Sequence, residues 1–252
     1  MRGAEVLTRT GTSVVGAAES AVESAKAAMT AGFRNVAWSW AGVPSGPLGW
    51  VSSHWTMPRL HSQVYKVMDR ELALQPDDEL LEVACGSAFF LDKYARHVGR
   101  VAGLDLSDVQ TDLARQRLAD RIAAGTAEIV HGDAGTLPWP DETFSVVTVM
   151  GSFECFPDPE KVLTELHRVL RPGGRAVMNI GEWVEPGTQT HRILDALWVW
   201  SEDDVRRMVE QAGLTDVAMS YASTAVNQLD EYLSKHMGGI AADMRTVHAT
   251  KA

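Results

Sequence analysis

Short apolar runs alternate with segments of helical periodicity along most of this chain. A run of four to eight apolar residues bounded by turn signals is typical of a buried strand, and apolar residues three and four apart are typical of a helix. The alternation predicts an α/β domain whose mostly parallel sheet is covered by helices on both faces. The strands are expected at residues 80–83, 101–105, 127–131, 144–150, 176–180, 216–222 and 244–250.

Local signals mark where several of the helices begin. Ser107 to Gln110 reads as a capping box that opens a helix running to about residue 123. Asp158 is suited to cap the next helix, with Pro159 in its first turn. Ser201 caps a further helix that ends at Ala212–Gly213. Helices are also expected at residues 59–74, 89–98 and 227–236.

The first 70 residues follow a different pattern. Residues 14–36 place apolar side chains at spacings of three and four, which predicts a helix. Residues 38–55 hold four of the eight tryptophans among closely spaced glycines and prolines, which interrupt regular structure. We therefore expect residues 1–70 to form a helical cap or lid and residues 71–252 to form the α/β domain.

Composition narrows the class of protein. The 252 residues are 45% hydrophobic and 22% charged, ordinary values for a globular chain, and the net charge of −10 argues against binding to nucleic-acid backbones. No apolar run reaches membrane-spanning length, and Glu19 and Glu23 argue against a signal peptide. Two cysteines without metal-ligand spacing are typical of a reducing compartment. We expect a cytoplasmic protein with no metal site, no membrane segment and no nucleic-acid partner.

Chemistry-bearing residues gather where the first strands end. The strand at 80–83 runs into the small-residue turn 84–88 and then a helix, a geometry that lets a nucleotide approach the backbone. Nineteen residues after Gly86, the second strand ends at Asp105, an offset suited to a carboxylate that binds ribose hydroxyls. Gly132-Asp133-Ala134 follows the third strand, and residues 166–175 (LHRVLRPGGR) join a helix to the fifth strand.

These motifs, in this order, resemble the class I S-adenosylmethionine-dependent methyltransferases, in particular the branch with quinone and small-molecule enzymes. The resemblance spans about residues 72–214 and implies a Rossmann-like, seven-stranded, mostly parallel sheet that binds S-adenosylmethionine. It departs from the family at Ala84 and Ala88, which replace the usual glycines. Carried over residue by residue, it implies a cofactor site made of Glu82, Ala84, Gly86, Ser87, Asp105, Leu106, Gln110, Asp133, Ala134, Met150 and Gly151.

The resemblance also implies a role for each part of that site. The amides of Gly86–Ser87 would face the methionine end of the cofactor, with Glu82 fixing the turn. Asp105–Leu106 would bind the ribose and pack on the adenine. Asp133–Ala134 would hydrogen-bond the adenine, and Met150–Gly151 would line the wall beside the sulfonium.

Methyl transfer also needs an aligned acceptor, and a hydroxyl or acidic carbon must first be deprotonated. Histidine is the usual base near neutral pH. The candidates are His54 and His61 in the cap, His191 after the fifth strand, and Glu154 beside the expected sulfonium wall. Glu154 lies before a Pro-Asp-Pro turn, where relatives carry a similar acid, so a scaffold role is open as well as that of a base.

The tryptophan-rich segments imply a small hydrophobic or aromatic acceptor, such as a specialised metabolite, methylated on oxygen, nitrogen or carbon. No Asn/Asp-Pro-Pro-Tyr stretch, typical of enzymes that methylate bases, follows the fourth strand. One alternative keeps the cofactor but catalyses a non-methylating reaction such as cyclisation. A second, a nicotinamide-dependent oxidoreductase, is disfavoured because the three-glycine fingerprint is incomplete and no Tyr-x-x-x-Lys pair follows. The oligomeric state stays open.

Overall fold

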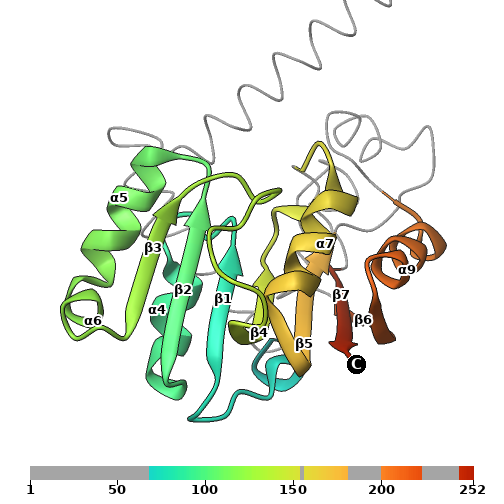
Figure 1. Cartoon of the computed structure of the whole chain (residues 1–252), viewed down its shortest axis with the longest axis horizontal. Coiled ribbons are helices and arrows are strands. Elements are labelled where there is room, and N and C mark those ends of the chain that lie inside the picture. The colour runs from blue at the N-terminus through green and yellow to red at the C-terminus, as the bar shows by residue number, and fades with distance from the viewer. Residues whose placement is uncertain (1–67, 154–155, 181–199, 223–243) are drawn as a thin grey trace, which may run out of the picture. The chain divides into compact units, whose positions relative to one another are not determined.

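The computed structural model describes residues 68–153, 156–180, 200–222 and 244–252 (Figure 1). The helices expected at 14–36 and 227–236, and almost all of the expected cap, lie outside these residues. The strands are β1 (Glu79–Val83), β2 (Arg100–Asp105), β3 (Ala127–His131), β4 (Phe144–Val149), β5 (Leu170–Ile180), β6 (Leu214–Ala222) and β7 (Met244–Lys251). The longer described helices are α4 (Phe89–Tyr94), α5 (Asp108–Arg117), α6 (Ala119–Ala123), α7 (Pro159–Val169) and α9 (Glu202–Gln211), and Ala95–His97 adds a short 3-10 turn.

The seven strands form one sheet in the order β3-β2-β1-β4-β5-β7-β6. β1 to β5 pair in parallel, whereas β7 is antiparallel to both β5 and β6. The order reverses between β1 and β4, and the carboxyl ends of β1, β2 and β3 lie at the same edge of the sheet (Figure 1). In doubly wound sheets ligands bind at this edge, beside such a switch point. The predicted Rossmann-like, mostly parallel fold is confirmed.

Helices cover both faces of the sheet, α4 behind it and α7 in front of it in Figure 1. One apolar core joins strand residues to α7 and α9, and a second joins them to α4, α5 and the short helical segment 68–72. β1 shows the alternation that produces this arrangement: Leu80 faces the α4 side, and Leu81 and Val83 face the α7 side. Glu82 shares the face of Leu80, so a carboxyl group is buried in the second core.

Most predicted elements are confirmed, with shifts at some ends. The helix expected at 107–123 divides at Leu118 into α5 and α6, because that residue leaves helical geometry at φ −100° and ψ 18°. β5 begins at Leu170 and not at Ala176, because Phe144 already pairs with Leu170. The register then shifts, so that Val146 pairs with Arg175 and residues 171–174 are additional residues on the β5 side of the ladder. None of the described helices is long and apolar enough to cross a membrane.

Candidate functional site

The turn between β1 and α4 uses three residues in the left-handed region. Ala84, Gly86 and Ala88 have φ values of 58°, 52° and 61°. Glycine adopts such angles freely, but an alanine does so at a cost in free energy. The structure therefore keeps the backbone path of a glycine turn even though the sequence supplies alanine at two of its three left-handed positions.

Asp105, at the end of β2, is tied to this turn. Its carboxylate accepts the main-chain N–H of Gly86 at 2.8 Å through Oδ2 and that of Ser107 at 2.9 Å through Oδ1. Among the amides of the described turn from Cys85 to Ala88, only that of Ser87 has no acceptor, because Cys85 donates to Leu104 and Ala88 donates to Cys85. The turn thus offers a ligand one free N–H beside a fixed carboxylate.

Glu82 lies beneath the same turn. The residue is 3% exposed, and Oε2 has no hydrogen-bond partner among the described residues. Burial raises the pKa of this carboxyl well above its usual range, and the nearby charge of Asp105 raises it further, while a hydrogen bond from the Leu91 amide acts in the opposite direction. A buried acceptor without a partner costs free energy of folding. The unpaired carboxyl oxygen of Glu82 therefore does not serve the stability of the fold and is available to hydrogen-bond a ligand.

The residues after Asp105 present an apolar surface next to the carboxylate. Leu106 is 52% exposed, which is unusual for leucine in this structure. Ser107 caps α5 by accepting the amide of Gln110 at 3.3 Å, and the side chain of Gln110 is buried beside the turn, near Gly86. An exposed apolar side chain next to hydrogen-bonding groups suits a ligand with a flat ring and a polar edge.

The Asp133 segment joins the same edge at the end of β3. The amide of Gly132 donates to the main-chain oxygen of Asp105 at 3.0 Å, which connects the ends of β2 and β3. Asp133 is exposed and accepts the amide of Gly135 through Oδ1 at 2.8 Å, while Ala134 is buried. The structure thus brings Asp105 and Asp133 to neighbouring strand ends, as predicted.

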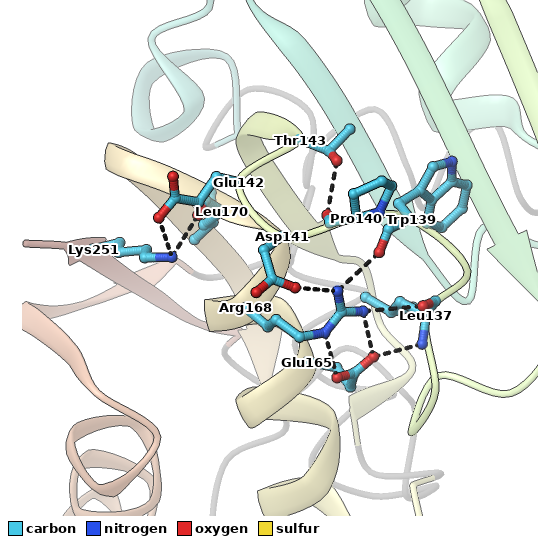
Figure 2. Close-up of polar contacts among 10 residues, drawn as sticks. All are labelled: Leu137, Trp139, Pro140, Asp141, Glu142, Thr143, Glu165, Arg168, Leu170 and Lys251. Carbon is cyan, nitrogen blue, oxygen red and sulfur yellow. Dashed lines mark hydrogen bonds and ion pairs between the residues drawn. The ribbon is translucent and has the colours of Figure 1, made fainter.

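Arg168 of α7 holds the loop that follows Asp133 (Figure 2). Its guanidinium donates to Glu165 through Nε and Nη2, to the main-chain oxygens of Leu137 and Trp139, and to Asp141, at 2.7–3.0 Å. Glu165 in turn accepts the amide of Leu137 at 2.7 Å. The hydrogen bonds from Arg168 lower the pKa of Glu165, and those same bonds raise the pKa of Arg168.

The segment after β4 has open space on one side and an aromatic cluster on the other. Gly151 has φ 61°, and no atom of the described residues lies within 4 Å of where a Cβ would stand. Met150 is partly buried against the core on the α4 side. Phe153 is fully buried and makes edge contacts with Phe156 and Trp200, with ring centroids 5.9 Å and 5.4 Å apart. The cluster fixes the backbone beyond Gly151 and leaves the glycine open to a ligand.

The four candidate bases, His54, His61, His191 and Glu154, lie outside the described residues and stay predictions. His131, expected to be structural, hydrogen-bonds the main-chain oxygen of Leu106 at 2.8 Å. Across the part of the chain that is described, no three His, Cys, Asp or Glu side chains gather as metal ligands.

Two arginines that support the site were missed in the sequence. Arg117 of α5 contacts Ser87 and Phe89 in the cofactor turn, and Arg168 holds the loop after Asp133. Arg168 stands inside the motif of residues 166–175, which could have drawn attention to it. Arg117 is separated from Ser87 by thirty residues and carries no local signal.

Comparison with known proteins agrees with this geometry. Residues 81–178 match the family described as methyltransferase domain. A demethylmenaquinone methyltransferase of Geobacillus kaustophilus is 34% identical over 122 residues, which are 47% of this chain and 52% of that protein. One from Listeria monocytogenes is 32% identical over 120 residues, covering 46% and 50%. The chain thus spans about half the length of the curated relatives it matches.

Solved structures show the same fold. The match to geranyl diphosphate C-methyltransferase of Streptomyces coelicolor A3(2) has a TM-score of 0.63 and 18% identity. It covers 76% of this chain and 78% of that protein. The 4+2 cyclase SpnF, with a TM-score of 0.61 and 21% identity, covers 75% and 80%. The family match over residues 81–178 and the demethylmenaquinone methyltransferase relatives support a methyltransferase domain of class I, the S-adenosylmethionine-dependent type.

Proposed function

We propose that this protein transfers a methyl group from S-adenosylmethionine to a small hydrophobic or aromatic metabolite. The observation that carries the proposal is the joined edge of β1 and β2, where the Asp105 carboxylate is fixed beside the free Ser87 amide. The family match and the demethylmenaquinone methyltransferase relatives support the same activity.

The residues present fit this cofactor. The free Ser87 amide suits the carboxylate of the methionine part, and Asp105 keeps lone pairs for ribose hydroxyls after binding two main-chain amides. Exposed Leu106 suits the adenine face, and Asp133 suits its amino group. Buried Glu82, whose Oε2 has no partner among the described residues, adds an acceptor under the turn.

When bound, S-adenosylmethionine supplies an electrophilic methyl group on a sulfonium. The chain contributes binding, alignment and exclusion of water, because a displacement is fast only when donor and acceptor are held in line. No described atom lies over the open face of Gly151, which would leave room there for an acceptor. We propose that residues 1–70 form a helical cap or lid segment, and that His54, His61, His191 or Glu154 removes a proton from the acceptor where one must leave.

Quinone-like acceptors are the first class to test, because the curated relatives are named demethylmenaquinone methyltransferases. A reaction without methyl transfer must be tested as well. A fold neighbour is named a 4+2 cyclase, so cofactor binding without methyl transfer is the alternative that the experiment must separate. We also propose that the protein acts in the cytoplasm, within specialised metabolism, on free small molecules.

The test begins with calorimetry on the whole chain, titrating S-adenosylmethionine, S-adenosylhomocysteine and NAD. We expect the two adenosyl compounds to bind and NAD not to bind, and the exposed Asp112→Ala variant in α5 to bind like the wild type. A labelled-methyl assay with reduced naphthoquinones, phenols and polyketide-like acceptors follows. Methyl incorporation supports the proposal, binding without incorporation across the panel favours the cyclase-like alternative, and no adenosyl binding overturns both.

A further inference from the structure

We infer that Arg117 is a positioning residue that locks the Ser87–Ala88 peptide in the orientation needed for cofactor binding. Its predicted effect on cofactor binding rests on the proposed function, whereas the locking of the Ser87–Ala88 peptide by Arg117 rests on the geometry of the turn alone. Arg117 is the last residue of α5 and reaches across thirty positions to the cofactor turn.

Arg117 touches the turn on both sides of Ala88. Its Nε donates to the main-chain oxygen of Ser87 at 2.8 Å. Its guanidinium carbon lies 3.6 Å from the centre of the Phe89 ring, within range of a cation–π contact. One side chain therefore fixes both a carbonyl in the turn and the first residue of α4.

Both ends of the Ser87–Ala88 peptide unit are held by hydrogen bonds. In a trans peptide the carbonyl oxygen and the following N–H point in opposite directions. The oxygen of Ser87 accepts from Arg117, and the N–H of Ala88 donates to the oxygen of Cys85 at 2.9 Å. The Ser87–Ala88 peptide can rotate only if both bonds break.

The backbone strain at Ala88 would be relieved if that peptide rotated. Its φ is +61°, a left-handed angle that costs an alanine free energy through contact between its Cβ and the backbone. Half a turn of the peptide plane would carry φ to about −120°, which every L-residue adopts easily. A glycine at this position would gain little free energy from the rotation. The contacts of Arg117 that prevent the rotation therefore matter because the residue is alanine.

Rotation would damage the site. It would move the Ser87 carbonyl to the opposite side of the turn and break the bond from Ala88 to Cys85, next to the Ser87 amide that is free for a ligand. A protein that spends part of its time in the rotated form binds more weakly, in proportion to the lost population. Arg117 thus raises affinity by removing the competing form.

The test is a double-substitution cycle with Arg117→Met and Ala88→Gly, measured by calorimetry with S-adenosylhomocysteine. Arg117→Met should weaken binding about tenfold, the usual effect of losing a hydrogen bond to a charged group. Ala88→Gly in the same chain should restore most of that loss, because glycine no longer favours the rotated peptide. Arg121→Met is the control, since that side chain in α6 has no hydrogen bond or ion pair among the described residues.

A cycle in urea without ligand keeps the inference separate from the proposed function. Ala88→Gly should stabilise the Arg117→Met protein more than it stabilises the wild type. If the wild type fails to bind S-adenosylhomocysteine, the proposed function is wrong, and the urea cycle still decides whether the lock exists. Equal effects of Ala88→Gly in both backgrounds, or equal loss of binding in Arg117→Met and Arg121→Met, would overturn the inference.

Discussion

The carboxylate of Asp105 holds the main-chain amide of Gly86 at 2.8 Å, across nineteen residues of sequence. Its second oxygen accepts the amide of Ser107, so the side chain proposed to bind ribose also builds the turn between β1 and α4. Each carboxylate oxygen has two acceptor sites, which makes the two tasks compatible. Substitution of Asp105 should therefore affect folding and cofactor binding together.

We expect Asp105→Asn to lower the free energy of unfolding by about 1–2 kcal/mol, because an amide offers one acceptor oxygen to two main-chain donors. The affinity for S-adenosylhomocysteine should fall more than tenfold, since the substituted NH₂ cannot accept from a hydroxyl. Urea unfolding and calorimetry measure the two effects. Asp112→Asn, at an exposed position of α5, should change stability by less than about 0.5 kcal/mol. Wild-type affinity in Asp105→Asn would contradict the assigned role.

Much of the fold was predictable because its signals are local. The apolar run of β1, the serine cap at Ser107 and the Asp158–Pro159 helix start all act within a few residues, and each is confirmed. The positions of Asp105 and Asp133 also followed, since the carboxyl ends of neighbouring parallel strands meet at one edge.

The connections made by long side chains were not predictable. Arg117 reaches Ser87, and Arg168 reaches Leu137 and Asp141, across about thirty positions in each case. Such contacts depend on how α5 and α7 pack on the sheet, which periodicity does not specify. The use of the Gly86 amide by Asp105 was missed for the same reason, and it leaves Ser87 as the free donor of the turn.

Ala84→Gly should stabilise the protein. Ala84 stands at φ 58°, where an L-side chain is strained, and glycine removes that strain at the cost of a more flexible unfolded chain. We expect the free energy of unfolding to rise by about 0.5 kcal/mol, with a higher melting temperature. Ala95→Gly is the matched control, because Ala95 is buried at a helical angle and its replacement should destabilise by about 1 kcal/mol. Destabilisation by both substitutions would contradict the strain argument.

Arg168→Lys should destabilise the loop after Asp133, because lysine keeps the charge but cannot donate in several fixed directions. We expect a loss of about 2 kcal/mol in urea unfolding, against less than about 1 kcal/mol for Arg171→Lys. The Arg171 side chain donates to the main-chain oxygen of Glu142 in a loop and to the side chain of Glu79 at the start of β1. Losses of equal size would contradict a special role for Arg168.

The same network predicts sensitivity to acid. Arg168 lowers the pKa of Glu165 below 4.5, so the folded state releases this proton more readily than the unfolded state. The resulting stability is present above about pH 4.5 and is lost as the pH falls through the folded pKa. Arg168→Met should flatten the dependence of unfolding free energy on pH between about pH 5 and 3, relative to the wild type. Parallel curves would show that Glu165 is not coupled to Arg168.

Glu82 predicts the opposite dependence on pH. Burial, reinforced by the charge of Asp105, raises the pKa of this carboxyl well above 4.5, so the folded state holds a proton that the unfolded state has released. The contribution is fully present below the unfolded pKa and declines as the pH rises toward the folded value. Glu82→Gln stays neutral throughout, so its stability relative to the wild type should improve with rising pH. Within that window the gain should approach about 1.4 kcal/mol per pH unit. Urea unfolding of both proteins at pH 5 and pH 8 measures it, and a difference that stays constant between those two values would show that Glu82 does not hold a proton in the folded state.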